Sequence, residues 1–349
     1  MRKAFWLVAA ATVLLFPTAV LADSISPSSF STTIAVGGTA TVDKTVTVNA
    51  GAPTSALVDV FFLADTTGSM GGTISAVQAS AGAILSSTAG LGDVQFAVGE
   101  YKDFGFGDPY AYRLNTALTG TLATAQAGIN LWAASGGADT PEAQLYALQQ
   151  VADTTTWRTG STRIVVWFGD APGHDPSGGV TEVTATASLV AEGILVEAIS
   201  VGFNQLDSTG QATRIAAATG GTFQSGINDA AIVAAITAAI NSAFLTYGNV
   251  TLDLSEVPAG LSASIIPSTG YTGSYDRSID RTFGFDLSFT GLVAGTYDFN
   301  VYALVDGGRI ATEVEHIVVG GAVPEPGTLL LLGSGLIGLA GYRRRARKM

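Results

Sequence analysis

Residues 56–64, ALVDVFFLA, form a run that is apolar at every position except Asp59. An uninterrupted apolar run is typical of a parallel sheet that helices cover on both faces. Similar strand-like runs recur at 94–100, 163–168 and 194–201, with helix-like segments at 74–85, 122–132, 141–151, 180–192, 211–218 and 228–244. This alternation predicts an α/β domain with a doubly wound, mostly parallel sheet, which we place at residues 55–247.

The segments on either side of this domain alternate apolar and polar residues, as the strands of an antiparallel sandwich do. They lie at 32–48 before the domain, and at 250–254, 261–266, 282–289, 296–305 and 310–319 after it. Neither piece makes a sandwich alone. We therefore expect residues 23–54 and 248–320 to form one antiparallel β-sandwich into which the α/β domain is inserted. Two independent β pieces are the alternative.

Residues 1–22 have a basic start, an apolar run and small residues at Val20 and Ala22, which is the pattern of a secretory signal peptide. An uncleaved anchor helix is the alternative, although Pro17 and the shortness of the apolar run favour cleavage.

Residues 323–349 begin with Val-Pro-Glu-Pro, continue with an apolar stretch at 327–342 and finish with a basic run at 343–348. The apolar stretch would form a short membrane helix with its arginines on the cytoplasmic side. This tail resembles the PEP-CTERM sorting signal of Gram-negative bacteria. The resemblance implies processing by an exosortase and delivery to the cell envelope, outer surface or exterior, with the membrane contacted only through the tail. A single-pass tail anchor is the alternative.

Charge and composition restrict the function. Residues 23–322 hold nine basic and 27 acidic residues, so nucleic acid is excluded as a partner and cations are favoured. The sequence has no cysteine and only two histidines, His174 and His316, which excludes thiol chemistry and thiolate metal sites. We expect His316 on the surface and His174 close to any ligand.

Three polar segments stand where the predicted strands meet their loops. Asp65, Thr67 and Ser69 follow the first apolar run at alternate positions, so that three oxygen ligands converge. Such ligands suit Mg²⁺, with Mn²⁺ or Ca²⁺ as alternatives. Asp139-Thr140-Pro141-Glu142 is expected to open a helix, and Asp170 ends the run at 163–168. Each segment alone could be ordinary capping or turn structure.

Together these segments resemble the metal-ion-dependent adhesion site (MIDAS) of the von Willebrand factor A domain family, in its integrin β-like and hemicentin-like type. The resemblance implies that a cation is held by Asp65, Thr67, Ser69, Glu142 and Asp170, with Thr140 as a reserve ligand. It also implies a second cation at Asp103 and Asp139. In this family a partner's carboxylate fills an open position on the metal, so the resemblance implies binding without catalysis.

We therefore expect a secreted or surface-attached bacterial protein whose cation recognises an acidic group on a protein or acidic polymer. A structural envelope or matrix component without metal function is one alternative. A haloacid-dehalogenase-like phosphatase is another, because 65–69 resembles an aspartyl-phosphate loop. That enzyme needs a lysine or equivalent cation before Asp170, but residues 103–169 contain no lysine, and the arginines nearest before Asp170 are Arg158 and Arg163.

Overall fold

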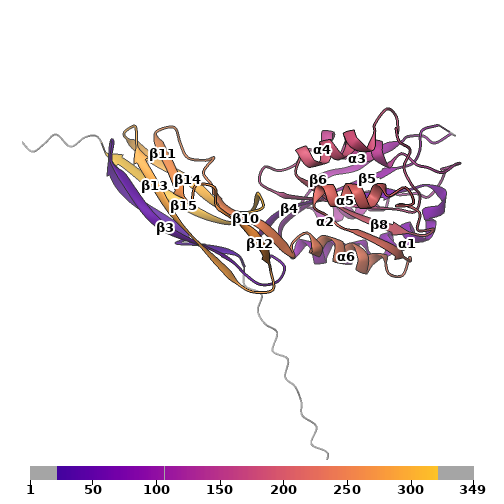
Figure 1. The fold of residues 1–349 in the computed structure, drawn as a ribbon, viewed down its shortest axis with the longest axis horizontal. Coiled ribbons are helices and arrows are strands. Elements are labelled where there is room, and N and C mark those ends of the chain that lie inside the picture. The colour runs from indigo at the N-terminus through magenta and orange to yellow at the C-terminus, as the bar shows by residue number, and fades with distance from the viewer. Residues whose placement is uncertain (1–21, 106, 321–349) are drawn as a thin grey trace, which may run out of the picture.

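The computed structural model describes residues 22–105 and 107–320, which form a β-sandwich and an α/β domain arranged end to end (Figure 1). Within these ranges no helix is long and apolar enough to span a membrane. The predicted signal peptide, apart from Ala22, and the predicted sorting tail with its short membrane helix lie outside the described residues.

The α/β domain is built on a six-stranded sheet. In spatial order its strands are β6 (Tyr112–Thr119), β5 (Gly92–Tyr101), β4 (Ala56–Asp65), β7 (Thr162–Gly169), β8 (Ile194–Val201) and β9 (Phe223–Ile227). All neighbours pair in parallel except β5 and β6, which are antiparallel. This sheet confirms the predicted fold class. The strands at its two edges, β6 and β9, were not predicted.

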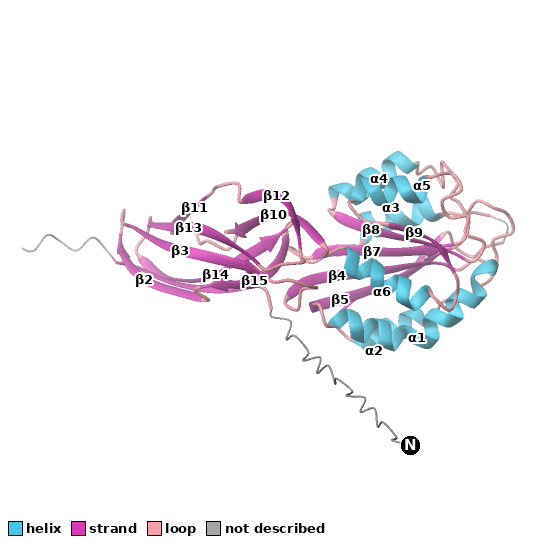
Figure 2. Cartoon of the chain, turned by 60° about the horizontal axis from the view of Figure 1, so that its bottom comes forward, coloured by secondary structure: helices cyan, strands magenta, loops and turns pink. Residues whose placement is uncertain are grey.

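Helices cover both faces of this sheet (Figure 2), and side chains of the central strand β4 pack against the helices on both faces. They are α1 (Gly71–Ala89), α2 (Leu122–Ile129), α3 (Gln144–Thr154), α4 (Glu182–Ala191), α5 (Gln211–Thr219) and α6 (Ile232–Ser242), with a 3₁₀ turn η1 (Gly68–Met70) before α1. Val60 and Phe62 pack under α1, α2 and α6, whereas Phe61 and Leu63 pack under α3, α4 and α5. Burial on both faces explains why β4 lacks polar alternation.

The sandwich takes strands from both sides of the α/β domain, which confirms the insertion. One sheet has the order β1 (Ser24–Ser26), β3 (Thr39–Val48), β13 (Arg281–Gly291) and β11 (Leu261–Ile266). The other has the order β12 (Tyr271–Asp276), β10 (Thr246–Asp253), β14 (Gly295–Val305), β15 (Gly308–Gly320) and β2 (Ser29–Ala35). Their pairings are antiparallel except between β15 and β2, which run parallel. The run predicted at 32–48 is thus two strands in different sheets.

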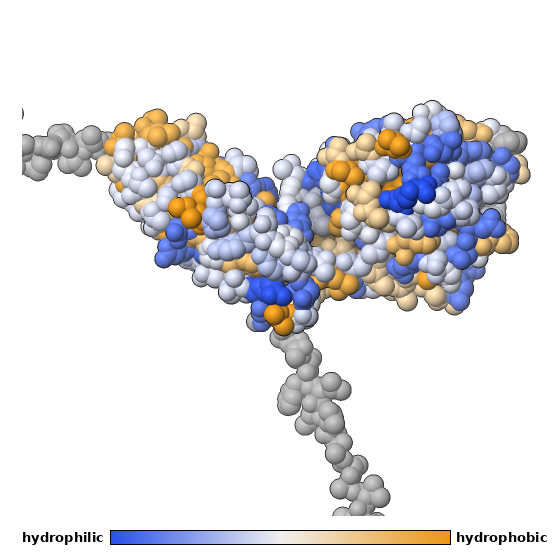
Figure 3. Space-filling model, viewed as in Figure 1, coloured by the Kyte–Doolittle hydropathy of each residue, from blue (hydrophilic) through white to orange (hydrophobic). Residues whose placement is uncertain are grey.

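The chain crosses between the domains at two points, from β3 to β4 and from α6 to β10. Ser55 donates a hydrogen bond to the Ile310 carbonyl at 2.8 Å, and the Arg309 amide donates to the Gly160 carbonyl at 2.9 Å. A hollow remains beside these contacts (Figure 3), with a pocket of about 430 Å³. Because β4 starts at this junction, the carboxyl ends of the parallel strands point away from the sandwich (Figure 1).

Candidate metal centre

Asp65 and Asp170 meet at the carboxyl ends of two neighbouring strands. β4 and β7 pair in register as far as Ala64 and Phe168, so the aspartates that follow reach the same edge of the sheet. Asp65 is fully buried and Asp170 is 3% exposed. Ligands in open α/β sheets bind at this edge.

Hydroxyl groups connect the two aspartates. Thr67 donates to Asp65 Oδ1 from its amide at 2.8 Å and from its hydroxyl at 2.7 Å. The Ser69 hydroxyl lies 3.4 Å from that of Thr67 and donates to Asp170 Oδ1 at 3.0 Å. The second carboxylate oxygens, Oδ2 of Asp65 and Oδ2 of Asp170, have no hydrogen-bond partner among the described residues. The network is therefore short of donors or positive charge.

Glu142 reaches the same place by a route that differs from the prediction. It does not open a helix, because α3 begins at Gln144. Instead the Glu142 amide donates to the Pro172 carbonyl at 2.8 Å, and the His174 amide donates to the Glu142 carbonyl at 2.9 Å. These bonds tie the loop before α3 to the loop after β7.

Gly137 lets the Glu142 carboxylate approach Thr67. A Cβ atom on Gly137 would lie 2.6 Å from Thr67 Cβ and 2.8 Å from Glu142 Oε1, and the residue has a φ of +67°. A side chain here would clash and be strained, so glycine is required. Glu142 Oε2 is a further buried carboxylate oxygen without a partner among the described residues.

Burial, reinforced at Asp65 and Glu142 by neighbouring negative charge, raises the pKa of all three carboxyl groups. Burial raises the pKa of Asp65 from 3.8 to about 7, with a further contribution from the charge of Asp170. Burial, and then the charges of Asp65, Asp103 and other acids, raise the pKa of Glu142 to about 9. Burial also raises the pKa of Asp170. A cation placed among them would favour the ionised forms, so the donor set fits a hard divalent ion.

The site opens to solvent through a pocket of about 230 Å³. Ser69, Thr140, Glu142 and Asp170 line it, whereas Asp65 and Thr67 lie buried beneath. Phe203 also lines the pocket and is 73% exposed. The structure thus brings together all six residues named from the sequence for the first site, and adds an apolar side chain at its rim.

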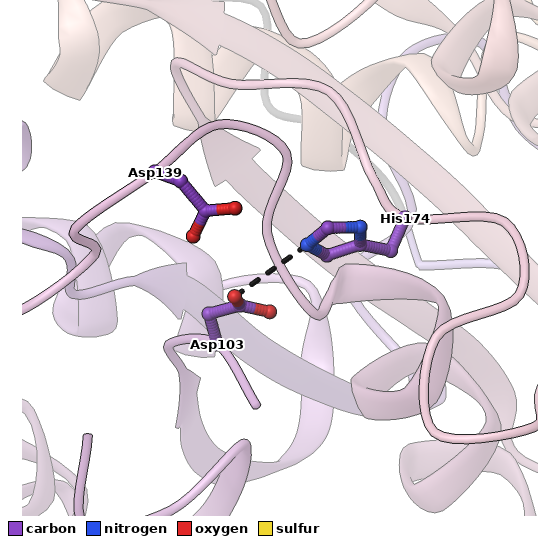
Figure 4. A group of neighbouring side chains, drawn as sticks. All are labelled: Asp103, Asp139 and His174. Carbon is purple, nitrogen blue, oxygen red and sulfur yellow. Dashed lines mark ion pairs between the residues drawn. The ribbon is translucent and has the colours of Figure 1, made fainter. Parts of the chain in front are cut away.

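A second cluster consists of Asp103, Asp139 and His174 (Figure 4). One ligand atom from each lies within 4.8 Å of the others, and His174 Nε2 is 3.5 Å from Asp103 Oδ2. Asp103 is 1% exposed, and neither of its carboxylate oxygens has a hydrogen-bond partner in the described part of the chain. The sequence had placed Asp103 and Asp139 together. The signal for His174 was its position four residues after Asp170.

Sequence reasoning missed the support from Lys102, which is 2% exposed. Its ammonium donates to the carbonyls of Ala133 at 3.1 Å, Ser135 at 2.7 Å and Thr66. These contacts fasten the loop before α3 to the loop after β4. Burial lowers the pKa of Lys102. Nothing in the local sequence predicts these bonds, because all three acceptors are backbone carbonyls.

Two family models match the sequence: the von Willebrand factor A domain at residues 59–223, and the PEP-CTERM protein-sorting motif at residues 322–345. The chain is a von Willebrand factor A domain protein. Its PEP-CTERM motif makes it an exported protein that an exosortase processes and sorts to the cell surface. Domains of this family are generally non-catalytic adhesion domains and often bind a divalent cation.

Several solved structures are similar to this A domain protein. A von Willebrand factor type A protein from Catenulispora acidiphila has a TM-score of 0.45 and 16% identity, over 90% of this chain and 77% of that one. The proximal thread matrix protein 1 of the mussel byssus has a TM-score of 0.43 and 17% identity, over 57% of this chain and 48% of that one. The pilus adhesin SpaC from Lactobacillus rhamnosus GG has a TM-score of 0.43 and 12% identity, over 80% of this chain and 46% of that one.

The chain therefore spans about half the length of the mussel and Lactobacillus proteins. Comparison with curated proteins finds no match.

Proposed function

We propose that the first site of the A domain binds a divalent cation, Mg²⁺ or alternatively Mn²⁺ or Ca²⁺, and through it an acidic group on a partner protein or polymer. Asp65, Thr67, Ser69, Glu142 and Asp170 would hold the cation, with Thr140 in reserve. The observation that carries this proposal is the convergence of three buried carboxylates, each with an unpartnered oxygen among the described residues, beside two hydroxyls. A bound cation supplies a Lewis-acidic position for an incoming carboxylate.

The pocket supports recognition of a partner. The pocket lies beyond the carboxyl ends of the parallel strands, which are at the end of the domain remote from the sandwich (Figure 2). The exposed Phe203 offers an apolar contact beside the polar centre, a combination typical of interaction sites. The domain thus presents its site on the side that faces away from the sandwich.

A phosphatase function has less support. Arg158 Nε pairs with Asp59 at 2.6 Å, and Arg163 pairs with Glu192 at 2.6 Å, both away from the pocket. Lys102, the remaining cationic candidate near the site, donates to three backbone carbonyls. None of the three is free to stabilise a transferred phosphoryl group.

A second cation at Asp103 and Asp139 is also part of the proposal, with His174 as a further ligand. An imidazole nitrogen beside two carboxylates suits Mn²⁺ or Zn²⁺ better than Ca²⁺. We expect His174→Ala to remove one of two Mn²⁺ equivalents and to leave the other in place. If His174→Ala still bound two Mn²⁺ equivalents, or bound none, the result would contradict a separate second site.

Calorimetric titration of the purified full chain with Mg²⁺, Ca²⁺ and Mn²⁺ tests the first site. Saturable Mg²⁺ and Ca²⁺ binding should disappear in Asp65→Asn and Asp170→Asn, which should keep only the Mn²⁺ equivalent of the second site. All binding should persist in Asp153→Asn, a matched change of an exposed aspartate on α3. Immobilised polyglutamate then tests recognition, which should require the cation and be reversed by a chelator. A wild-type chain that binds no cation would refute the proposal and favour a structural role without metal.

A further inference from the structure

Three ionisable side chains lie inside the sandwich, where apolar residues are expected. Lys44 projects inward from β3 in one sheet, and Glu313 and Glu315 project inward from β15 in the other. None of the three side chains has any exposed surface. The Lys44 ammonium contacts Glu313 Oε1 directly and lies 3.3 Å from Glu315 Oε1.

The surroundings offer these groups little solvation. The Lys44 ammonium lies 5.1 Å from the centre of the Phe30 ring, and Phe30 in turn stacks on Phe289. Glu313 Oε2 and Glu315 Oε2 have no hydrogen-bond partner among the described residues. One ammonium therefore faces two carboxyl groups in a fully buried interior. Burying such charges is unfavourable, and the attraction within a single ion pair does not always offset the lost hydration.

A proton is available within the cluster. Burial raises the pKa of Glu313, and burial together with the neighbouring Glu313 raises the pKa of Glu315 to about 7. A protonated carboxyl group is the electrophile that an amine attacks, and a neighbouring carboxylate can accept a proton from the amine.

We propose that Lys44 and Glu313 become joined by an intramolecular amide bond, with Glu315 as the group that carries the proton. This modification does not depend on the cation site. In the proposed reaction Lys44 Nζ forms a bond to Glu313 Cδ, and one Cδ–O bond breaks. Of the three ammonium hydrogens, one remains on the amide nitrogen and two leave with the carboxylate oxygen as water. Atoms and charge balance without an oxidant or a second substrate.

Two physical effects favour this reaction. The fold holds nucleophile and carboxyl group in contact, and such intramolecular placement can correspond to effective molarities of about 10⁵–10⁸ M. The product replaces a buried ion pair by a neutral amide, which costs less to bury than two charges. The amide N–H would remain beside Glu315, which could accept its hydrogen bond.

The bond would have a mechanical consequence for a surface protein. The sorting motif at 322–345 follows β15, and β3 leads into the A domain. A pull between the surface and a bound partner therefore enters the sandwich through β15 and leaves it through the two crossings to the A domain, at β3 and at β10. An amide between positions 269 residues apart would pass this force directly from β15 to β3. Strands β10 to β14 would then no longer be the only covalent route for this load.

Mass spectrometry of the full chain tests the proposal. Proteolysis should release one branched peptide that contains Lys44 and Glu313, lighter by one water molecule than the two linear peptides combined. Fragmentation between Glu313 and Glu315 identifies the joined residue. Linear peptides alone would overturn the proposal, and a bond to Glu315 would overturn the roles assigned to the two glutamates. The wild-type chain is sufficient for this measurement, so no variant needs to fold.

Variants test the mechanism. Lys44→Arg keeps the positive charge but cannot form the amide, so its intact mass should show no loss of water. Glu315→Gln should form the bond in a much smaller fraction of molecules, because the proton carrier is missing. Thr45→Ala, an outward-facing change next to Lys44, should cross-link like the wild type. Full cross-linking in Glu315→Gln would overturn the role of Glu315.

Discussion

Replacing Asp65 by Asn should stabilise the cation-free A domain while abolishing cation binding. Asp65 is fully buried, and its Oδ1 accepts two hydrogen bonds from Thr67 that an amide oxygen can also accept. Asp65 Oδ2 has no hydrogen-bond partner among the described residues. Asparagine places its NH₂ group at that position, so the substitution removes a buried charge without breaking a hydrogen bond. Function and stability should thus oppose each other at this residue.

The size of the effect follows from the pKa of Asp65. Each pKa unit corresponds to about 1.4 kcal/mol, so a rise from 3.8 to about 7 corresponds to about 4 kcal/mol. Because the folded pKa is the higher one, wild-type stability falls as pH rises from 3.8 to about 7 and is constant above that. The variant should therefore gain about 4 kcal/mol at pH 8, equivalent to about 10 °C in melting temperature, and little below pH 4.

Tryptophan fluorescence can follow this unfolding selectively. The tryptophans in the described residues, Trp132, Trp157 and Trp167, all belong to the A domain. Melts would compare wild type, Asp65→Asn and the control Asp153→Asn in chelator, at pH 5 and pH 8. Saturating Mg²⁺ should then stabilise the wild type and Asp153→Asn, but not Asp65→Asn, by about 2.7 kcal/mol at a hundredfold excess over Kd. An Asn variant no more stable than the wild type at pH 8, or a pH-independent difference, would refute the reasoning.

Three further substitutions test the fold and the site. Gly137→Ala should weaken cation binding about tenfold or more by strain and clash, whereas Gly179→Ala, with a φ of +88° and open space around it, should spare binding in the same titration. Lys102→Met should cost about 3 kcal/mol in urea unfolding, because three carbonyls lose their donor. In the sandwich, Leu287→Ala should lower the free energy of unfolding by about 2–5 kcal/mol in urea denaturation, because Leu287 is fully buried. The control Val314→Ala should lower it by about 0.5 kcal/mol or less, because Val314 is half exposed.

The sequence was sufficient to predict the strands that are buried on both faces of the sheet, because burial on both faces requires a continuous apolar run. The central strands β4, β5, β7 and β8 were predicted because their apolar runs are continuous. The edge strands β6 and β12 were not, because each is half polar and pairs with a neighbour on one side only. Glu142 was placed in a helix because Pro141 is typical of a first turn. Its bonds to the loop after β7 are non-local and leave no sequence signal.

The same distinction applies to the site. Asp65, Thr67 and Ser69 are neighbours in the chain, so their spacing alone indicates a common centre. Asp170 joins them because parallel strands end at one edge of the sheet. Lys102 could not be predicted, because its role depends on the path of a loop that begins thirty residues later in the chain. Local motifs therefore indicated the donors, and only the tertiary fold revealed how those donors are held.

β15 gives the opposite case, in which the sequence pattern is misleading for a physical reason. Its alternation would be expected to expose Glu313 and Glu315 and to bury Val314, but the structure buries both glutamates and leaves Val314 53% exposed. The side chains of a strand alternate strictly, so Ile317 and Val319 can enter the core only if residues 313 and 315 point the same way. The apolar end of β15 thus forces two acids inside, where Lys44 is the cation they meet. Two acids held against one amine in a buried core are the ingredients of an amide bond, and so a strand register fixed by two apolar residues becomes the structural origin of the proposed cross-link.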